Sequence, residues 1–197
     1  VGTNCDGVSP IEKIRCCSYT AGTTVESMAK SDSFFIRAKL PYTGPFGQTS
    51  IDLGAYVDAL GKSVLRIHNV STQYVFGPFA APNVGTAGVD ADVAWQLTTQ
   101  SQIDNVDATD KSVISTGQLH VSSEVLANSF STITETTDIN PQNWRNGYLV
   151  GVEQIYLGGK MGTAWQAGFE PSLVIVMECT VETLSQSAAM ALALSQQ

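Results

Sequence analysis

Two histidines are the residues of this chain best suited to metal binding or acid–base chemistry. His68 and His120 are the only histidines, and both fall in stretches that alternate as β-strands do. With Glu124 or Asp92 as a third ligand, they would form a two-histidine centre of the cupin-like kind. A sheet histidine is more commonly held by hydrogen bonds to its neighbours. We therefore expect both to be structural, and we predict no metal or organic cofactor.

Three aspartates form a second candidate site. Asp104, Asp107 and Asp110 are evenly spaced in an acidic turn, and their carboxylates could supply oxygen ligands to Ca²⁺. The spacing differs from that of an EF-hand loop, and the glycine and closing glutamate of such a loop are missing. We therefore predict a solvated acidic turn and no calcium site.

Other residues would suit carbohydrate chemistry. Glu153 and Glu178 could act as a glycosidase pair if they faced each other across two paired strands. Asn69-Val-Ser71 fits the glycosylation sequon. The tryptophans could stack on sugars, although packing is their commoner use; they are Trp95, Trp144 and Trp165. No nucleophile elbow, Walker loop, dinucleotide fingerprint or zinc-protease motif occurs, so we predict a non-enzyme without catalytic residues.

The four cysteines match no zinc-binding pattern. Cys16 and Cys17 are adjacent and cannot easily bond to each other. Cys5 could pair with either of them in an oxidising environment. Cys179 falls on the apolar face of a predicted strand, which favours a buried free thiol.

Two apolar runs near the C-terminus predict the centre of the fold. Residues 148–157 and 173–182 are rich in β-branched and aromatic residues and have the length of strands. We predict that they pair at the centre of an all-β core. The second run is apolar on both faces at first and on one face toward Glu182. This change is typical of a strand that leaves the middle of a sheet for its rim.

The rest of the chain predicts further strands with short helical insertions. Strands are predicted over 33–40, 64–76, 93–99, 112–121 and 130–137, helices over 52–60 and 122–128, and a single turn over 138–144. The apolar positions of 64–76 change parity after Asn69, which predicts a β-bulge. Gly117 is a second candidate for a bulge.

We divide the chain into an irregular N-terminal arm (1–32), a β-sandwich (33–182) and a helical tail (183–197). Thr183 and Gln186 form a capping-box pattern ahead of an alanine-rich run. The apolar stripe predicted for this helix consists of Leu184, Ala188, Ala191, Leu192 and Ser195. Because the stripe is narrow, we expect the helix to pack outside the main core, against the inner side of an assembly or a neighbouring molecule.

Composition bounds the function. Hydrophobic residues make up 43% of the 197 residues, enough for a packed core, but charged residues only 14%. Burial between copies would explain the scarcity of charge. The net charge of −8 argues against a basic surface that would bind the phosphates of a nucleic acid. No apolar run is long enough for a transmembrane helix. The chain begins with Val1, so we expect that a leader was removed or that residues precede it.

This pattern favours a jelly-roll type β-sandwich, with about seven or eight strands and helical insertions in the loops. The layout of residues 33–182 resembles that of single jelly-roll capsid proteins of icosahedral viruses. The resemblance implies a coat subunit in a virion, which assembles with copies of itself and with any other shell proteins. That family often carries a basic N-terminal arm, and these residues show none. Strong contact with the genome is therefore expected only if such an arm precedes them.

Two other functions remain open on the sequence. A secreted filament or adhesin subunit, located outside the cell or on its surface, would also suit the low charge and the cysteines near the N-terminus. A carbohydrate-binding or cupin-like module would use the same sandwich for a ligand.

Overall fold

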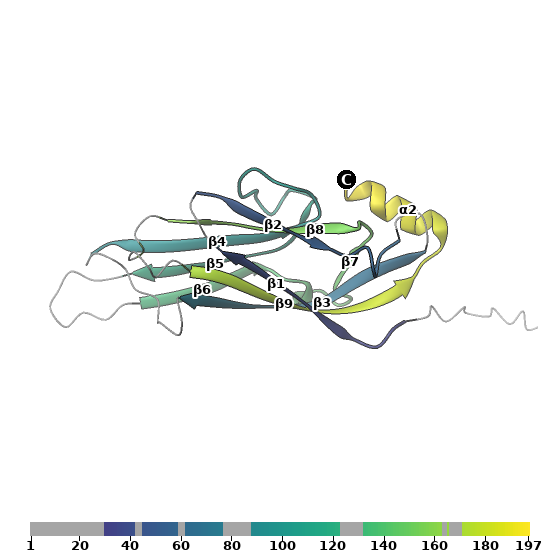
Figure 1. Ribbon diagram of the computed structural model, residues 1–197, viewed down its shortest axis with the longest axis horizontal. Helices are drawn as coiled ribbons and strands as arrows, with labels where there is room; N and C mark the ends of the chain where they lie inside the picture. The colour runs from purple at the N-terminus through teal and green to yellow at the C-terminus, as the bar shows by residue number, and fades with distance from the viewer. Residues whose placement is uncertain are drawn as a thin grey trace, which may run out of the picture.

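A β-sandwich with one C-terminal helix makes up the computed structural model, which describes residues 30–41, 45–58, 62–76, 88–122, 132–162, 165 and 171–197 (Figure 1). The predicted N-terminal arm up to residue 29, with Cys5, Cys16 and Cys17, and the predicted helix beyond Ser122 lie outside these residues. The strands are β1 (Phe34–Pro41), β2 (Gly47–Asp52), β3 (Ser63–Phe76), β4 (Asp90–Thr98), β5 (Val113–Ser122), β6 (Thr132–Ile139), β7 (Tyr148–Val150), β8 (Gln154–Met161) and β9 (Pro171–Thr183). The helices are the 3-10 turn η1 (Pro141–Asn143) and α2 (Gln186–Ser195).

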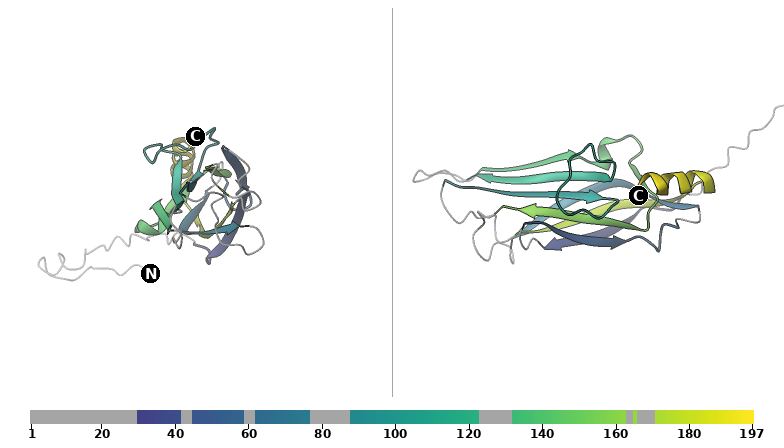
Figure 2. Two further views of the ribbon diagram at one scale, coloured as in Figure 1. Left: turned by 90° about the vertical axis from the view of Figure 1, so that its left-hand side faces the viewer. Right: turned by 90° about the horizontal axis from the view of Figure 1, so that it is seen from above.

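Strand order defines the fold. Sheet A has the order β1-β9-β3-β7, and sheet B has the order β2-β8-β4-β5-β6. Every pair is antiparallel. The first four strands alternate between the sheets, as do the last three. Without β6, the order is that of an eight-stranded jelly roll, so the predicted fold class is confirmed. The sixth strand is an addition at the border of sheet B (Figure 2).

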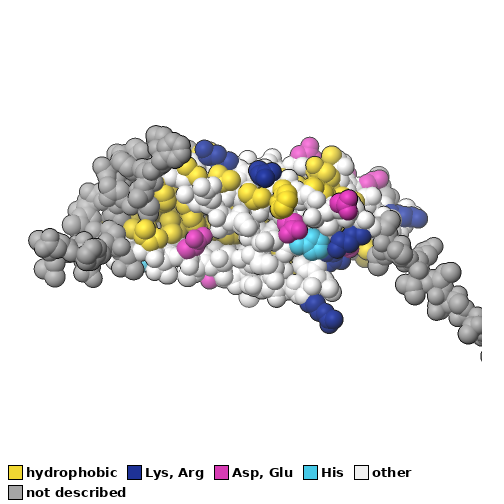
Figure 3. Space-filling view, turned by 90° about the horizontal axis from the view of Figure 1, so that it is seen from below, with side chains coloured by type: hydrophobic (Ala, Val, Ile, Leu, Met, Phe, Trp, Pro, Cys, Tyr) yellow, Lys and Arg dark blue, Asp and Glu magenta, His cyan; other side chains and the backbone are white. Residues whose placement is uncertain are grey.

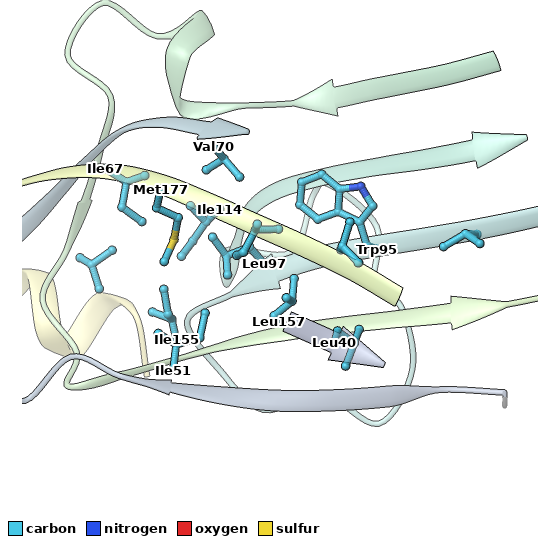
Figure 4. Close-up of a cluster of buried hydrophobic side chains, with 14 of the residues drawn as sticks. Leu40, Ile51, Ile67, Val70, Trp95, Leu97, Ile114, Ile155, Leu157 and Met177 are labelled. Atoms are coloured by element: carbon cyan, nitrogen blue, oxygen red, sulfur yellow. The ribbon is translucent and has the colours of Figure 1, made fainter. Parts of the chain in front are cut away.

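The core fills the space between the two sheets (Figure 4). The inward residues of β9 are fully buried, because Leu173, Ile175, Met177 and Cys179 each have 0% exposure. Sheet B contributes residues such as Trp95 from β4, which is 2% exposed. Strict alternation of apolar residues gives each strand one face to bury, and the facing sheet provides the partner surface.

The predicted bulge in β3 is confirmed. Ile67 pairs with Cys179 and Asn69 with Glu178, so His68 is the extra residue. This insertion lets the apolar positions on both sides of it face the core. The second predicted bulge is displaced. A register shift does occur at Gly117, but the extra residue is Asp138 on the neighbouring β6.

The predicted central pair is wrong. Residues 148–157 do not form one strand, since β7 lies in sheet A and β8 in sheet B. The chain crosses between the sheets at 151–153, where the Leu53 amide donates to the Glu153 carbonyl. The real neighbours of β9 are β1 and β3. A continuous β-branched run could not reveal this crossing, because both parts favour extended backbone.

The predicted helix over 52–60 is also wrong. Asp52 ends β2, and Leu53 accepts hydrogen bonds from the amides of Tyr56 and Val57 in a single turn. Leu53 and Val57 are 0% and 2% exposed, so their helical spacing reflects one buried turn between two sheets.

The C-terminal helix exists, but its start and its buried face differ from the prediction. Its cap is Ser185, whose side chain accepts a hydrogen bond from the Ala188 amide, and not Thr183. Ala189 and Ala193 are the buried helical residues, whereas the predicted stripe is exposed or half-buried. The helix therefore packs against its own subunit through small residues, a contact that hydrophobicity alone does not reveal.

Close packing around Gly117 gives a first prediction. An added Cβ at Gly117 would lie 2.7 Å from Trp95 Nε1 and 2.9 Å from the Thr136 carbonyl oxygen. We expect Gly117→Ala to lower the free energy of unfolding by about 1–3 kcal/mol, because overpacking forces the core to shift. Gly47→Ala is the control, since its Cβ would meet no atom closer than 3.9 Å. Equal denaturation midpoints for the two variants would contradict the prediction.

Candidate functional site

The two histidines do not form a site together. His68 lies in sheet A, and its Nε2 atom is 2.9 Å from Thr180 Oγ1. His120 lies in sheet B, and its Nδ1 atom is 2.5 Å from Asp92 Oδ1. Glu124 lies outside the described residues. The structure therefore gives each histidine a separate hydrogen-bonding partner, as expected for sheet histidines.

The pKa values of these histidines shift in opposite directions. Burial lowers the pKa of His68, and the nearby charges of Lys30 and Arg66 lower it further. The hydrogen bond to Asp92 raises the pKa of His120. The carboxylates of Glu178 and Glu182 act on His68 in the opposite direction, so burial is the main cause of its lowered pKa. His120 forms an ion pair with Asp92 at the surface when it is protonated.

Each aspartate of the acidic turn serves its own local backbone. Asp104 accepts from the Asn105 amide and from Lys160, Asp107 accepts from Thr109, and Asp110 accepts from the Ser112 amide. These hydrogen bonds lower the pKa of all three carboxyl groups. The carboxylates therefore support successive turns of this loop.

The residues considered for carbohydrate chemistry are also dispersed. Glu178 is on β9 in sheet A, and Glu153 lies in the crossing between the sheets, so the two do not face each other across paired strands. Trp95 and Trp165 are buried, and only Trp144 is exposed. Asn69 follows the bulge in β3. The glutamates, the tryptophans and the glycosylation sequon therefore do not form one sugar-binding surface.

Cys179 is a buried free thiol, as predicted. Its side chain is fully buried in the inward row of β9, and burial raises its pKa to about 12. The reactive thiolate is therefore scarce at neutral pH.

Over the described ranges, no three His, Cys, Asp or Glu side chains lie close enough to hold a metal ion. None of the helices in this part of the chain is long and apolar enough to cross a membrane. The open cavities lie on the surface; one of about 460 Å³ is lined by residues that include Thr99, Gly151 and Gln196.

A bidentate ion pair between Arg66 and Glu182 connects β3 and β9 at one end of sheet A. Arg66 donates from Nε and Nη2 to the two carboxylate oxygens of Glu182, both at 2.7 Å. Its Nη1 atom donates to the Asn146 carbonyl at 2.5 Å. Lys30 adds a longer ion pair to Glu182 at 3.7 Å. The side chains of Arg66 and Glu182 are only 17% and 10% exposed, and the bonds from Arg66 hold the pKa of Glu182 below its usual value.

Sequence reasoning missed this cluster. The one available signal was a charged residue inside each of two apolar strands, Arg66 in β3 and Glu182 in β9. Their contact depends on the strand register. Arg66 pairs with Thr180, and Glu182 pairs with Val64, so Arg66 and Glu182 are diagonal neighbours on the two strands.

A second polar anchor fixes the C-terminus. The Gln196 side chain donates to the Leu149 carbonyl at 2.7 Å and accepts from the Gly151 amide at 2.8 Å. Its backbone carbonyl accepts from Thr99 Oγ1 at 3.0 Å. Gln196 is 4% exposed. This residue therefore connects α2 to the crossing between β7 and β8 and to the loop after β4.

Large apolar side chains remain exposed on several surfaces of the subunit. Phe35 on β1 is 55% exposed, Ile133 on β6 is 53% exposed, and Leu194 on α2 is 68% exposed. The others are Tyr56, Val89, Ile103, Trp144 and Met190. Figure 3 shows hydrophobic patches between charged groups on the face seen from below. Such residues lie on both sheets, in a loop and on the helix, so the apolar surface is divided among several sides.

Comparisons with known proteins give a fold likeness. No protein-family model matches the sequence, and no curated protein matches it. A chain in the solved structure of Desmodium yellow mottle tymovirus is similar, with 10% sequence identity and a TM-score of 0.37. The similarity covers 79% of this chain and 82% of that chain. A likeness this distant concerns the fold and assigns no function.

Breaking the Arg66–Glu182 pair gives a second prediction. We expect Glu182→Gln to lower the free energy of unfolding by about 2 kcal/mol at neutral pH, because Arg66 loses its charged partner in a mostly buried position. The lowered pKa of Glu182 means that this stabilisation is present above about pH 4.3 and is lost as the pH falls through the lowered value. Chemical denaturation across pH should show the difference shrinking in acid. The exposed Glu153→Gln provides the control.

Removing the Gln196 side chain gives a third prediction. Gln196→Ala leaves the Gly151 amide and the Leu149 carbonyl without their partner, so we expect a loss of about 1–2 kcal/mol and faster amide hydrogen exchange in α2. Gln186→Ala, at the exposed start of the same helix, should have little effect. Unchanged exchange rates in the Gln196 variant would show that α2 docks by other contacts.

Proposed function

We propose that this chain is a virion coat subunit that assembles with copies of itself into a closed icosahedral shell. The observation that carries the proposal is the strand order, β1-β9-β3-β7 against β2-β8-β4-β5. Viral capsid proteins, lectins and cupins share jelly-roll architecture, so the choice among them depends on the interior, the surface and the candidate sites.

The packed interior speaks against a cupin-like module. Apolar side chains from both sheets fill the space where such a protein would hold its metal and ligand. His68 and His120 have separate partners on different sheets. A lectin-like site receives no better support, because Trp144 is the only exposed tryptophan in the described part of the chain.

The surface favours a subunit with several neighbours. Charged residues are 14% of the sequence, and the exposed apolar side chains lie on different sides of the sandwich. A pairwise complex needs one apolar surface, whereas a shell subunit contacts several copies. Interface cores are depleted in charge and enriched in aromatic residues and methionine, which agrees with exposed Phe35, Trp144 and Met190.

Assembly is the fourth prediction. We expect the purified chain to sediment as particles far larger than the 20.9 kDa subunit and to appear as closed shells of uniform diameter by electron microscopy. Open helical arrays would instead favour the secreted filament. A stable monomer at micromolar concentration would contradict both functions.

The helix provides a matched variant for this experiment. Leu194→Ser should leave the melting temperature of the subunit unchanged, because the side chain is 68% exposed. The variant should weaken assembly if α2 contacts a neighbour. Ala193→Leu, which enlarges a 6% exposed residue, should instead destabilise the subunit itself.

A further inference from the structure

The two sheets end in edge strands of opposite charge. At one border of sheet A, β1 presents Arg37 and Lys39 with exposed side chains and carries no acidic residue. At the far border of sheet B, β6 carries Glu135 and Asp138 and no basic residue. Each strand pairs on one side only within the described structure, so each has backbone donors and acceptors available on its other side.

The β1 edge opens into a groove. Its volume is about 410 Å³, and it lies between β1 and β2, the edge strands of the two sheets. Arg37, Lys39 and the exposed Phe35 line it together with Tyr56, which is 37% exposed. The Arg37 guanidinium lies 5.9 Å from the centre of the Phe35 ring. The groove also includes one carboxylate, Asp52 at the end of β2, so its two cations leave it with a net positive charge. A free strand edge, this positive charge and exposed aromatic rings suit an extended acidic segment.

The β6 strand has the complementary properties. It lies outside the eight-stranded jelly roll, and the opposite strand β7 has only three residues. Sheet A still reaches β6 at one point, where Thr72 Oγ1 on β3 donates to the exposed Glu135 carboxylate at 3.0 Å. Ile133, Thr134, Glu135, Thr137 and Asp138 are all exposed, including neighbours that point to opposite faces. The strand pairs with β5 along one edge, and its other edge and both of its faces are open to another molecule.

Charge determines which edges can pair. Two β1 edges would bring Arg37 and Lys39 of both copies together, and two β6 edges would bring their carboxylates together. Like charges across paired strands are destabilising, and opposite charges are favourable. The same charges that prevent each edge from pairing with itself therefore select the other edge as its partner.

We propose that β6 of one copy adds as a strand to the β1 edge of a second copy. The proposal rests on the proposed function, since it names one contact of the self-assembling subunit. The two strands pair in parallel, so that Ile133 beside Phe35 brings Glu135 beside Arg37 and Asp138 toward the Lys39 end of the groove. The contact joins two different surfaces, so every subunit gives one strand and receives another. Such contacts repeat from copy to copy and close into rings when the rotation permits.

Charge reversal tests the contact. Arg37→Glu with Lys39→Glu makes both edges acidic, and Glu135→Lys with Asp138→Lys makes both edges basic. We expect each double variant to raise the concentration for half-maximal assembly by about tenfold or more in sedimentation velocity. The control for the first double variant is Lys62→Glu with Arg145→Glu, which makes the same change in net charge at exposed positions outside β1 and β6. Circular dichroism should show that all three variants are folded.

Mixing the two double variants provides the decisive measurement. The acidic β1 of one variant then meets the basic β6 of the other, and the reverse also holds, so the two variants should bind each other in an equimolar mixture although neither binds itself. Normal assembly of either variant by itself overturns the proposed contact, as does a mixture in which sedimentation velocity shows no complex between the two variants. In both cases the assembly of the wild-type chain still supports the coat function. A wild-type chain that stays monomeric overturns both.

Discussion

Burial of one apolar face per strand between two sheets is the constraint on which the structure depends. The inward residues of β9, from Leu173 to Cys179, are completely buried only because sheet B lies over them. Neither sheet is stable without the other, since each would expose its apolar face to water. The chain satisfies this requirement by crossing repeatedly from one sheet to the other, and those crossings produce the jelly-roll order.

Hydrogen bonds and ion pairs stabilise one end of the sandwich, beyond the limit of the apolar core. Arg66 and Glu182 connect β3 to β9, and Arg66 also reaches the turn before β7 through the Asn146 carbonyl. Gln196 joins the end of the chain to the crossing at Gly151. The bonds of Gln196 to the Gly151 amide and the Leu149 carbonyl hold the end of α2 against the sheets.

The proposed function depends on the surface, because apolar side chains fill the described part of the core. The core is filled, the two histidines have separate partners, and the aspartates support their own turns. What remains is a low-charge exterior with apolar side chains on several sides and two edge strands of opposite charge. The proposed structural role in an assembly rests on these features.

The sequence by itself determined the all-β class, six of the strands (β1, β3, β4, β5, β6 and β9), the bulge in β3 and the buried state of Cys179, because alternation and residue type are local properties. It missed β2, whose residues it assigned to a loop and the start of a helix. Only the tertiary structure decided that residues 148–157 divide between two sheets and that Ala189 and Ala193 form the buried face of α2. It likewise brought Arg66 to Glu182 and set β1 and β6 at opposite borders. These outcomes depend on contacts between residues far apart in the chain, and such contacts leave no periodic pattern in the sequence.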